Sequence, residues 1–386
     1  MHPRDLVLRF LETTGRPAEA EFYLRLFRKG RPESFAVIAV SESAMRLSAD
    51  ALALDLRYLA RLGLCPVLVF GLVTPARARE HAEAIRARLA DDVFAAITPP
   101  DEAAAAAAAG SIPLVPLGSI GGEGKADIDR RFSALADLAT ALQSRKIVFL
   151  GRRSGLKRQS GQIVSLVDLT REAAALCAPG ALPPKQAALL SQIQEIEAQI
   201  PHRLTLAVTS PLELLRELFT ERGAGTLIRR GSNIARFDSL AAADEAKFQA
   251  LLEAAFGRRP HPRLFSRPVS QVLVADDYRG AVVVTPTPLA PYLSKFAVDP
   301  GARGEGVGRD LWRALTEEVP AFFWRSRREN PFTSWYMRHC DGMARAGTWC
   351  VFWRGLPEEK LLGAIAYARD ADDDFAPAAK EPHMPG

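Results

Sequence analysis

The residues best suited to do chemistry form a glycine-rich turn. The apolar stretch 292–298 predicts a strand, and a helix is predicted from about Val307, at the end of the turn. A turn between a strand and a helix start presents free backbone N–H groups and the positive end of the helix dipole, so it suits an anion such as a pyrophosphate. On its own the pattern is equally compatible with a plain tight turn. The turn contains Arg303, Gly304, Gly306 and Gly308.

A second group of candidate residues lies in the stretch 322–327, FFWRSR. If this stretch is a strand, its period of two places Arg325 and Arg327 on one face. Two guanidinium groups on one face can bind carboxylates through paired hydrogen bonds. Taken alone, the stretch is more often a solvated basic edge or a phosphate patch, so its context must decide.

Other motifs carry less chemistry. The glycine cluster 118–126 fails as a phosphate-binding loop, because Ser119 replaces the first glycine and Ala126 stands where a Ser or Thr would hold magnesium. We expect a flexible surface loop there. His339 and Cys340 have no third group at catalytic or metal-ligand spacing, so we expect structural roles and no metal site.

The elements that must position these residues fall into two groups. Short apolar runs at 35–40, 66–70, 112–116 and 146–150 alternate with stretches of helical periodicity such as 50–62 and 76–90, and a further apolar run at 204–209 precedes a helix opened by Ser210. Strands that alternate with helices predict a parallel sheet covered on both faces.

Composition supports a second, smaller domain. The chain has 386 residues, which favours two or three domains, and its 48% hydrophobic and 25% charged residues exclude disorder as the main state. All five tryptophans follow residue 311, which places a boundary near residue 235. The stretch 369–386 is rich in Asp, Ala and Pro, so we expect a disordered tail.

Charge and cysteine content bound the partners and the compartment. A net charge of +5 suits an anionic ligand, but no basic stripe with stacking aromatics indicates nucleic acid. The four cysteines lack a C-x-x-C pair, the N-terminal stretch has no apolar core typical of a signal peptide, and no window is apolar enough for a membrane span. We expect a cytoplasmic protein that binds no membrane.

Several motifs occur together in a recognisable order. The segments YLSKFAVDPGARGEGVGRDLW, FFWRSRRENPFTSWYMRHCDG and WCVFWRGL resemble the acetyltransferase domain of the N-acetylglutamate synthases shared by vertebrates and some bacteria, which include bifunctional synthase/kinases. The upstream segments LALDLRYLARLGLCPVLVFG, KIVFLGRRSGL and SPLELLRELFTERGAGTLIRRG are similar to the amino-acid kinase domain of the same enzymes.

The resemblance implies an α/β fold in two parts. Residues 1–234 would form an amino-acid kinase-like αβα sandwich with a mainly parallel sheet, acting in regulation or oligomer formation. Residues 235–368 would form a smaller α+β domain of the Gcn5-related N-acetyltransferase type, followed by the tail. The family resemblance also implies a homo-oligomer, either a dimer or a tetramer.

The resemblance also implies the roles of individual residues. Acetyl-CoA is the implied co-substrate and L-glutamate the implied acetyl acceptor, with Tyr336 protonating the departing thiolate. No carboxylate or histidine stands out as the general base, and a water relay is an alternative. The residues implied to bind glutamate are Arg258, Lys295, Arg325, Arg327 and Asn330, and those implied to bind acetyl-CoA are Ala297, Val298, Arg303, Gly304, Gly306 and Gly308.

The implied function is N-acetylglutamate synthesis, the first step of arginine biosynthesis. Two alternatives remain open: an acetyltransferase of the same fold that acts on another amine, and an arginine-responsive regulatory protein without turnover. Arginine-sensitive members bind arginine around the segment that corresponds to Glu217–Gly223, with Tyr23–Phe27 as a candidate mobile helix. Glu217 could equally be a solvated residue at a helix end.

The kinase-like region departs from the pattern of an active kinase. Where the family has V-I-K-x-G-G, this chain has residues 37–42, VIAVSE, and the later H-G-G is replaced by Phe70, Gly71 and Leu72. The change removes a cation and adds an anion where ATP phosphates would lie, and phosphoryl transfer needs positive charge there. We therefore expect no acetylglutamate kinase activity.

Overall fold

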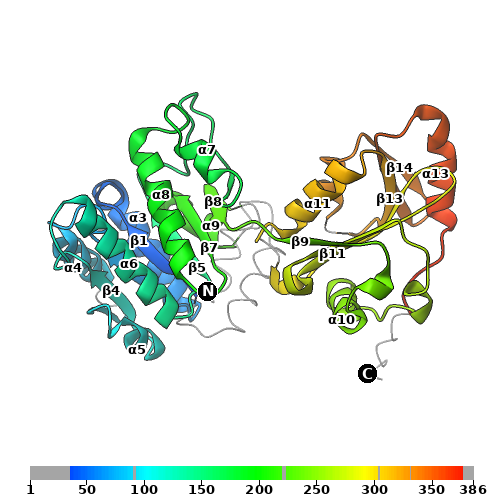
Figure 1. Cartoon of the computed structure of the whole chain (residues 1–386). Helices are drawn as coiled ribbons and strands as arrows, with labels where there is room; N and C mark the ends of the chain where they lie inside the picture. The colour runs from blue at the N-terminus through cyan, green and yellow to red at the C-terminus, as the bar shows by residue number, and fades with distance from the viewer. Residues whose placement is uncertain (1–34, 90–92, 220–222, 303–304, 331, 377–386) are drawn as a thin grey trace, which may run out of the picture. The chain divides into compact units, whose positions relative to one another are not determined.

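The structure is a computed structural model that describes residues 35–89, 93–219, 223–302, 305–330 and 332–376. The predicted helix Tyr23–Phe27 lies outside the described residues. The chain divides into two compact units, Met1–Arg230 and Gly231–Gly386, coloured blue to green and green to red in Figure 1. Each unit contains its own sheet.

Among the described residues, the sheet of the first unit has eight strands in the order β3-β4-β2-β1-β5-β7-β8-β6. All neighbouring strands pair in parallel except β7 and β8. The strands are β1 (Val37–Val40), β2 (Val67–Phe70), β3 (Ala95–Ile97), β4 (Ile112–Pro116), β5 (Lys146–Leu150), β6 (Leu166–Asp168), β7 (Thr205–Thr209) and β8 (Thr226–Arg229).

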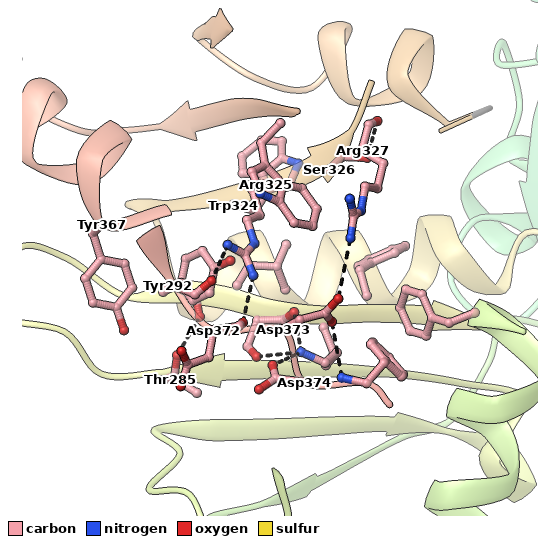
Figure 2. A pocket seen from close by; sticks show the side chains of 18 of the residues that line it. Thr285, Tyr292, Trp324, Arg325, Ser326, Arg327, Tyr367, Asp372, Asp373 and Asp374 are labelled. Carbon is pink, nitrogen blue, oxygen red and sulfur yellow. Dashed lines mark hydrogen bonds and ion pairs between the residues drawn. The ribbon is translucent and has the colours of Figure 1, made fainter. Parts of the chain in front are cut away.

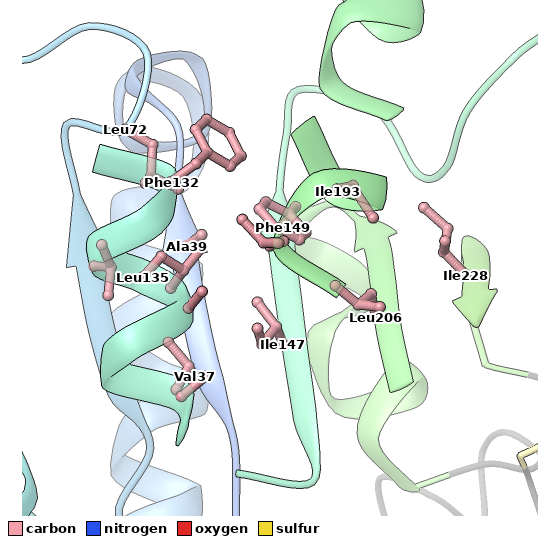
Figure 3. Close-up of a cluster of buried hydrophobic side chains, with 14 of the residues drawn as sticks. Val37, Ala39, Leu72, Phe132, Leu135, Ile147, Phe149, Ile193, Leu206 and Ile228 are labelled. Atoms are coloured by element: carbon pink, nitrogen blue, oxygen red, sulfur yellow. The ribbon is translucent and has the colours of Figure 1, made fainter. Parts of the chain in front are cut away.

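Helices cover both faces of this sheet. Because side chains alternate along a strand, Ile38 and Val40 of β1 face one helix layer, and Val37 and Ala39 face the other. Figure 3 shows the second layer, where Phe132 packs against Phe149 with ring centroids 6.3 Å apart. One layer contains α3 (Glu42–Arg61), α4 (Ala78–Leu89) and α9 (Leu214–Phe219); the other contains α5 (Ala103–Ala108), α6 (Lys125–Ala141), α7 (Ala173–Cys177) and α8 (Pro184–Gln199).

The sheet of the second unit has the order β14-β15-β13-β12-β11-β10-β9 within the described ranges. Its strands are antiparallel to their neighbours except for β12 and β13, which are parallel. The strands are β9 (Ile234–Phe237), β10 (Gln271–Ala275), β11 (Gly280–Thr285), β12 (Tyr292–Val298), β13 (Phe322–Arg327), β14 (Gly342–Ala346) and β15 (Trp349–Arg354).

Three helices bury the apolar side chains of this second sheet. Helix α11 (Val307–Glu318) packs with Leu273 and Val282, whereas α10 (Glu245–Phe256) packs with the alternate residues Val272 and Val283. Helix α13 (Glu358–Asp370) covers Phe323 of β13. The short helix α12 (Thr333–Met337) follows β13. The predicted fold class, a mainly parallel αβα sandwich followed by a smaller α+β unit, is confirmed.

The predicted disordered tail is wrong in its first part. Helix α13 continues to Asp370, and the residues that follow have defined positions as far as Ala376. Asp374 is buried, with only 6% of its surface exposed. Residues 377–386 lie outside the described part of the chain.

No helix in the part of the chain that the structure describes combines the length and apolar character needed to cross a bilayer.

Candidate active site

The second unit contains a pocket of about 760 Å³. Strands β12 and β13, the end of α10 and the chain after α13 form its walls, as Figure 2 shows. Apolar and aromatic walls with a few converging charged groups are typical of a small-molecule site. The cationic side chains that line it are Arg258, Arg267, Lys295, Arg325 and Arg327.

The two central strands diverge beside this pocket. The register between β12 and β13 contains one pair, Tyr292 with Phe323, whereas β12 pairs with β11 along its whole length. Beyond Leu293, the edge of β12 on the pocket side therefore has backbone N–H and C=O groups that form no register pair with β13. Ala297 and Val298, the predicted acetyl-CoA contacts, lie at the far end of this edge.

The glycine-rich turn follows β12 directly. Gly306 is the N-cap of α11 with φ of 81°, a left-handed conformation that favours glycine. A Cβ on Gly308 would lie 3.4 Å from Val298 Cγ2, so the first turn of the helix packs closely on the strand. The four N–H groups that open a helix have no partner within it, and this helix start adjoins the end of β12. Arg303 and Gly304 lie outside the described residues.

Lys295 is the most deeply buried cation of the pocket. Its side chain is only 7% exposed, and its Nζ donates to the carbonyl and the hydroxyl of Ser294, both at 3.1 Å, and to Asp374. Burial lowers the pKa of Lys295, and the neighbouring Asp374 carboxylate counteracts part of that effect. A buried ammonium needs an anionic partner, which suits a carboxylate ligand.

Arg325 and Arg327 lie on the same face of β13, as the strand period predicted. Their guanidinium carbons lie 4.1 Å and 4.2 Å from the ring centroid of Trp349 on the neighbouring strand. This stacking holds both planar groups toward the pocket. Arg325 also donates to the carbonyls of Ala368 at 2.7 Å and Ala371 at 2.6 Å, so it binds the C-terminal end of α13.

Arg258 enters the pocket from the end of α10. Gly257 ends that helix in the left-handed region with φ of 66°, which turns the chain so that the next side chain reaches the sheet. Arg258 Nη1 lies 2.9 Å from Asp373 Oδ2. Arg267, which the sequence did not single out, lies on the same wall with its Nη1 2.5 Å from Asp374 Oδ1.

Asn330 lines the pocket, but its side-chain amide forms hydrogen bonds within the turn that follows β13. Its Nδ2 donates to Ser326 Oγ at 2.6 Å, and its Oδ1 accepts from the N–H of Phe332 at 2.8 Å. The side chain therefore shapes the loop after β13 in this structure. Neither bond uses the second N–H of Nδ2, so the predicted contact of Asn330 with glutamate stays a prediction.

Tyr336 reaches the pocket from α12. Its ring packs on Trp324 and Phe352 with centroids 5.7 Å and 5.5 Å away. Burial raises the pKa of the Tyr336 hydroxyl, so the group keeps its proton at neutral pH. A protonated hydroxyl at the pocket wall is able to donate a proton to a thiolate.

His339 and Cys340 lie near Tyr336 in structural positions. The ring of His339 stacks on Trp335 at 4.1 Å, and its Nδ1 lies 2.8 Å from the Trp335 carbonyl oxygen. Across the described residues, no group of three or more His, Cys, Asp or Glu side chains has an arrangement that would hold a metal.

Sequence reasoning missed the acidic side of the pocket. The run Asp372-Asp373-Asp374 was assigned to a disordered tail, yet all three residues line the pocket together with Phe375. The signal available in the sequence was this run of acids in a basic chain, downstream of the basic cluster that contains Arg258 and Arg267. Complementary charge between the two stretches could have suggested the contact.

In the first unit, the end of strand β1 is the place where ATP phosphates would lie in an active kinase. Ser41 follows β1 and caps α3, its Oγ accepting from the N–H of Ala44 at 3.2 Å, and Glu42 occupies the first turn of that helix. In parallel sheets, ligands bind outside the carboxyl ends of the strands. Here the end of β1 is followed by a glutamate, whose Oε1 lies 3.9 Å from Arg77 Nη1.

The glycine cluster 118–126 is an exposed loop that a buried arginine anchors through hydrogen bonds. Arg131 is fully buried and donates to the carbonyls of Leu72, Ile120 and Gly122 at 2.9, 2.8 and 2.7 Å. The guanidinium therefore ties the loop to the turn that follows β2. This contact is the reason why the loop has a defined position.

Glu217 is neither solvated nor available to a ligand in this structure. Its side chain is 2% exposed, with Oε1 2.8 Å from Lys146 Nζ and Oε2 2.7 Å from the N–H of Ala224. Gly223 has φ of 61°, and a Cβ there would lie 2.3 Å from Glu217 Oε2. The solvated alternative for Glu217 is therefore wrong, and an arginine bound there would have to replace Lys146.

Comparison with known proteins defines the class of the second unit. Residues 235–370 match the family model described as NAT, N-acetyltransferase, of N-acetylglutamate synthase. The second unit is an N-acetyltransferase domain of this type.

Relatives extend the likeness to nearly the whole chain, which is homologous to N-acetylglutamate synthases. The mitochondrial N-acetylglutamate synthase of Homo sapiens is 28% identical over 98% of this chain and 81% of its own length. An acetylglutamate kinase of Xylella fastidiosa is 35% identical over 58% of this chain, which spans about half (53%) of that kinase. The predicted family resemblance is confirmed.

Solved structures support the fold. The N-acetylglutamate synthase of Neisseria gonorrhoeae, solved with coenzyme A and N-acetyl-glutamate, has a TM-score of 0.50 and 19% sequence identity, covering 88% of this chain and 99% of that chain.

Proposed function

We propose that this chain is an N-acetylglutamate synthase, which transfers the acetyl group of acetyl-CoA to the α-amine of L-glutamate. The observation that carries the proposal is the convergence of five cationic side chains on one pocket beside the diverging edge of β12. Homology to synthases over nearly the full length supports the same activity.

The charge of the pocket fits the proposed acceptor. Glutamate has two carboxylates and one amine, and two opposite unit charges about 4 Å apart attract by roughly 4 kcal/mol at a protein surface. Lys295, buried at one wall, and Arg325 and Arg327, stacked on Trp349 at another, provide cations on neighbouring strands. A ligand with two carboxylates can contact both walls.

The proposed position of acetyl-CoA follows from the strand and helix geometry. Its pyrophosphate would lie at the turn that opens α11, where Gly306 and Gly308 allow close approach to backbone N–H groups. The acyl arm would lie along the edge of β12. A backbone N–H near Val298 would then stabilise the oxyanion that develops on the thioester carbonyl.

The proposed reaction is a direct transfer. The neutral amine of glutamate, having released a first proton to water, attacks the thioester carbon and the C–N bond forms. As the C–S bond breaks, the nitrogen releases a second proton to water and the amide results. The Tyr336 hydroxyl protonates the departing thiolate and regains a proton from solvent. The raised pKa of Tyr336 keeps that proton available.

The experiment that tests this function detects the product directly. Purified protein is incubated with acetyl-CoA and a panel of amino acids, and N-acetylated products and free coenzyme A are measured by mass spectrometry. The proposal expects N-acetylglutamate with glutamate. Thiol release only with another amine would assign the function to a different acetyltransferase, and no product with any amine would favour a regulatory protein.

Arginine regulation, a homo-oligomer and a cytoplasmic location are further proposals. The N. gonorrhoeae synthase has also been solved with coenzyme A and L-arginine, which supports testing arginine as an effector here. Adding arginine to the same assay tests regulation, and light scattering tests the oligomer. Since the human relative is named mitochondrial, location is best tested by fractionation of the source cells.

A further inference from the structure

The chain after helix α13 returns into the proposed glutamate pocket. We call residues Asp372–Phe375 the acidic segment. Figure 2 shows its carboxylates among the cationic side chains of the pocket. Two separate sets of contacts hold it there, one from side chains and one from the backbone.

The side-chain contacts join two carboxylates to two pairs of cations. Asp374 contacts Lys295 and lies 2.5 Å from Arg267 Nη1. Asp373 Oδ2 lies 2.9 Å from Arg258 Nη1 and 3.4 Å from Arg327 Nη2. Of these four cations, three are predicted glutamate contacts.

The backbone contacts fix the register of the segment. The His261 N–H donates to the Asp374 carbonyl at 2.8 Å and the Ala376 N–H to the Arg259 carbonyl at 2.9 Å, so Phe375 forms an antiparallel bridge with Pro260. The ring of Phe375 lies 4.8 Å from that of Phe256. Arg325 Nη2 donates to the Asp372 carbonyl at 2.8 Å.

The acidic segment therefore presents the same groups as the proposed substrate. The carboxylates of two consecutive residues each contact two cations of the pocket, and the two carboxylates of glutamate could contact the same cations. Burial acts to raise the pKa of Asp373, but the hydrogen bonds from Arg258 and the Phe375 N–H, with the charge of Arg327, together outweigh it and lower the pKa. Asp373 therefore remains a carboxylate at neutral pH. Both ligands cannot occupy Lys295 at once.

We propose that the acidic segment is an internal ligand of the glutamate site, which substrate must displace before it can bind. This inference rests on the proposed function and adds that the acidic segment competes with glutamate for the pocket. An attached ligand has an effective concentration in the millimolar range. If the segment is docked in about nine of ten molecules, the apparent affinity for glutamate is lowered about tenfold.

The first test compares two single substitutions in the segment. Asp374→Asn removes the partner of Lys295, whereas Asp372→Asn removes an equal charge whose carboxylate is 67% exposed and lies 3.6 Å from Arg263 and Arg267. We expect Asp374→Asn to lower the KM for glutamate about tenfold and Asp372→Asn to change it less than twofold. The KM for acetyl-CoA serves as an internal reference.

The outcomes separate the inference from the proposed function. If all three proteins make N-acetylglutamate with the same KM for glutamate, the internal ligand is rejected and the synthase stands. A higher KM in Asp374→Asn would show that the segment helps to bind substrate, which also overturns the inference. No product from any of the three proteins would reject the synthase and, with it, the competitor.

A second test uses the unmodified chain. Hydrogen exchange is followed by mass spectrometry at peptides that contain the amides of His261 and Ala376. The first amide donates to Asp374 of the segment, and the second follows the segment directly and donates to Arg259. We expect saturating glutamate to speed exchange at these amides by at least about tenfold, because displacement opens both bonds. Slower or unchanged exchange in a protein that turns glutamate over would overturn the inference.

Discussion

The two units differ in their charged side chains at the places where each would bind an anionic ligand. In the first unit, the end of β1 leads into Ser41 and Glu42, where phosphate binding would need a cation. In the second unit, the edge of β12 and the neighbouring β13 carry Lys295, Arg325 and Arg327. Both sheets are well packed, so the difference lies in a few side chains at strand ends. Fold alone therefore does not decide activity.

Each unit contains a buried ion pair, and the two pairs differ in their surroundings. Lys146 and Glu217 of the first unit are joined by short contacts in which every carboxylate oxygen has a donor from the protein. Lys295 and Asp374 of the second unit are equally buried, but they line a pocket that a ligand can enter. The first pair serves stability, whereas the second pair lies where substrate is proposed to bind.

The largest expected difference between the units is in activity: the second unit acetylates glutamate, and the first has no kinase activity. With ATP and N-acetylglutamate, we expect no acetylglutamyl phosphate, because Glu42 repels phosphate at the end of β1 and no lysine follows Ile38. Hydroxylamine trapping would detect the acyl phosphate. The same preparation must form N-acetylglutamate from acetyl-CoA, and trapped acyl phosphate would contradict the contrast between the units.

Removal of a pocket cation should have the next largest effect. We expect Arg325→Ala to lower kcat/KM for glutamate roughly thirty- to several thousandfold. This corresponds to a loss of about 2–5 kcal/mol of transition-state stabilisation, since a desolvated charged contact is lost. Arg345→Ala, at the exposed position of β14, is the matched control. Calorimetry should show coenzyme A binding in both variants. Unchanged kinetics in Arg325→Ala would remove this residue from the substrate site.

Loss of the proposed acid should slow turnover with little change in binding. We expect Tyr336→Phe to lower kcat about a hundredfold, the lower range for general acid catalysis, while the KM for glutamate stays within about twofold. Tyr278→Phe, outside the pocket, is the control. An equal kcat for Tyr336→Phe and the unmodified enzyme would show that another donor protonates the thiolate.

The smallest effect on turnover is expected in the first unit. Glu217→Gln leaves Lys146 without a carboxylate partner in a buried place and should cost about 3 kcal/mol of stability. Glu213→Gln, which breaks an exposed pair with Arg216, should cost under about 1 kcal/mol. Thermal unfolding measures both. A large loss of turnover at a temperature where Glu217→Gln is folded would give this pair a role beyond stability.

Local patterns were sufficient for much of the fold and part of the site. The strands 292–298 and 322–327 were predicted at the residues where they occur, because their apolar runs are strong and their ends are marked by Asp299 and the polar stretch after Arg327. The shared face of Arg325 and Arg327 followed from the strand period alone, and both stack on Trp349.

Long-range pairing explains what the sequence did not reveal. Asp373 meets Arg258 from 115 residues away, Asp374 meets Lys295 from 79 residues away, and Glu217 meets Lys146 from 71 residues away. Composition predicts a disordered tail for the acids near the C-terminus, since nothing in the local sequence offers them a partner. Only the folded sheet brings the cations to them.

The central claim is that the cationic pocket selects an acceptor with two carboxylates, and substrate discrimination tests it most directly. Rates of acetylation are compared for glutamate and glutamine, which have nearly the same shape but differ by one charge. The account predicts that kcat/KM is at least about a hundredfold higher for glutamate, the discrimination expected for a charged contact that goes unpaired. Equal values, or a preference for glutamine, would contradict it.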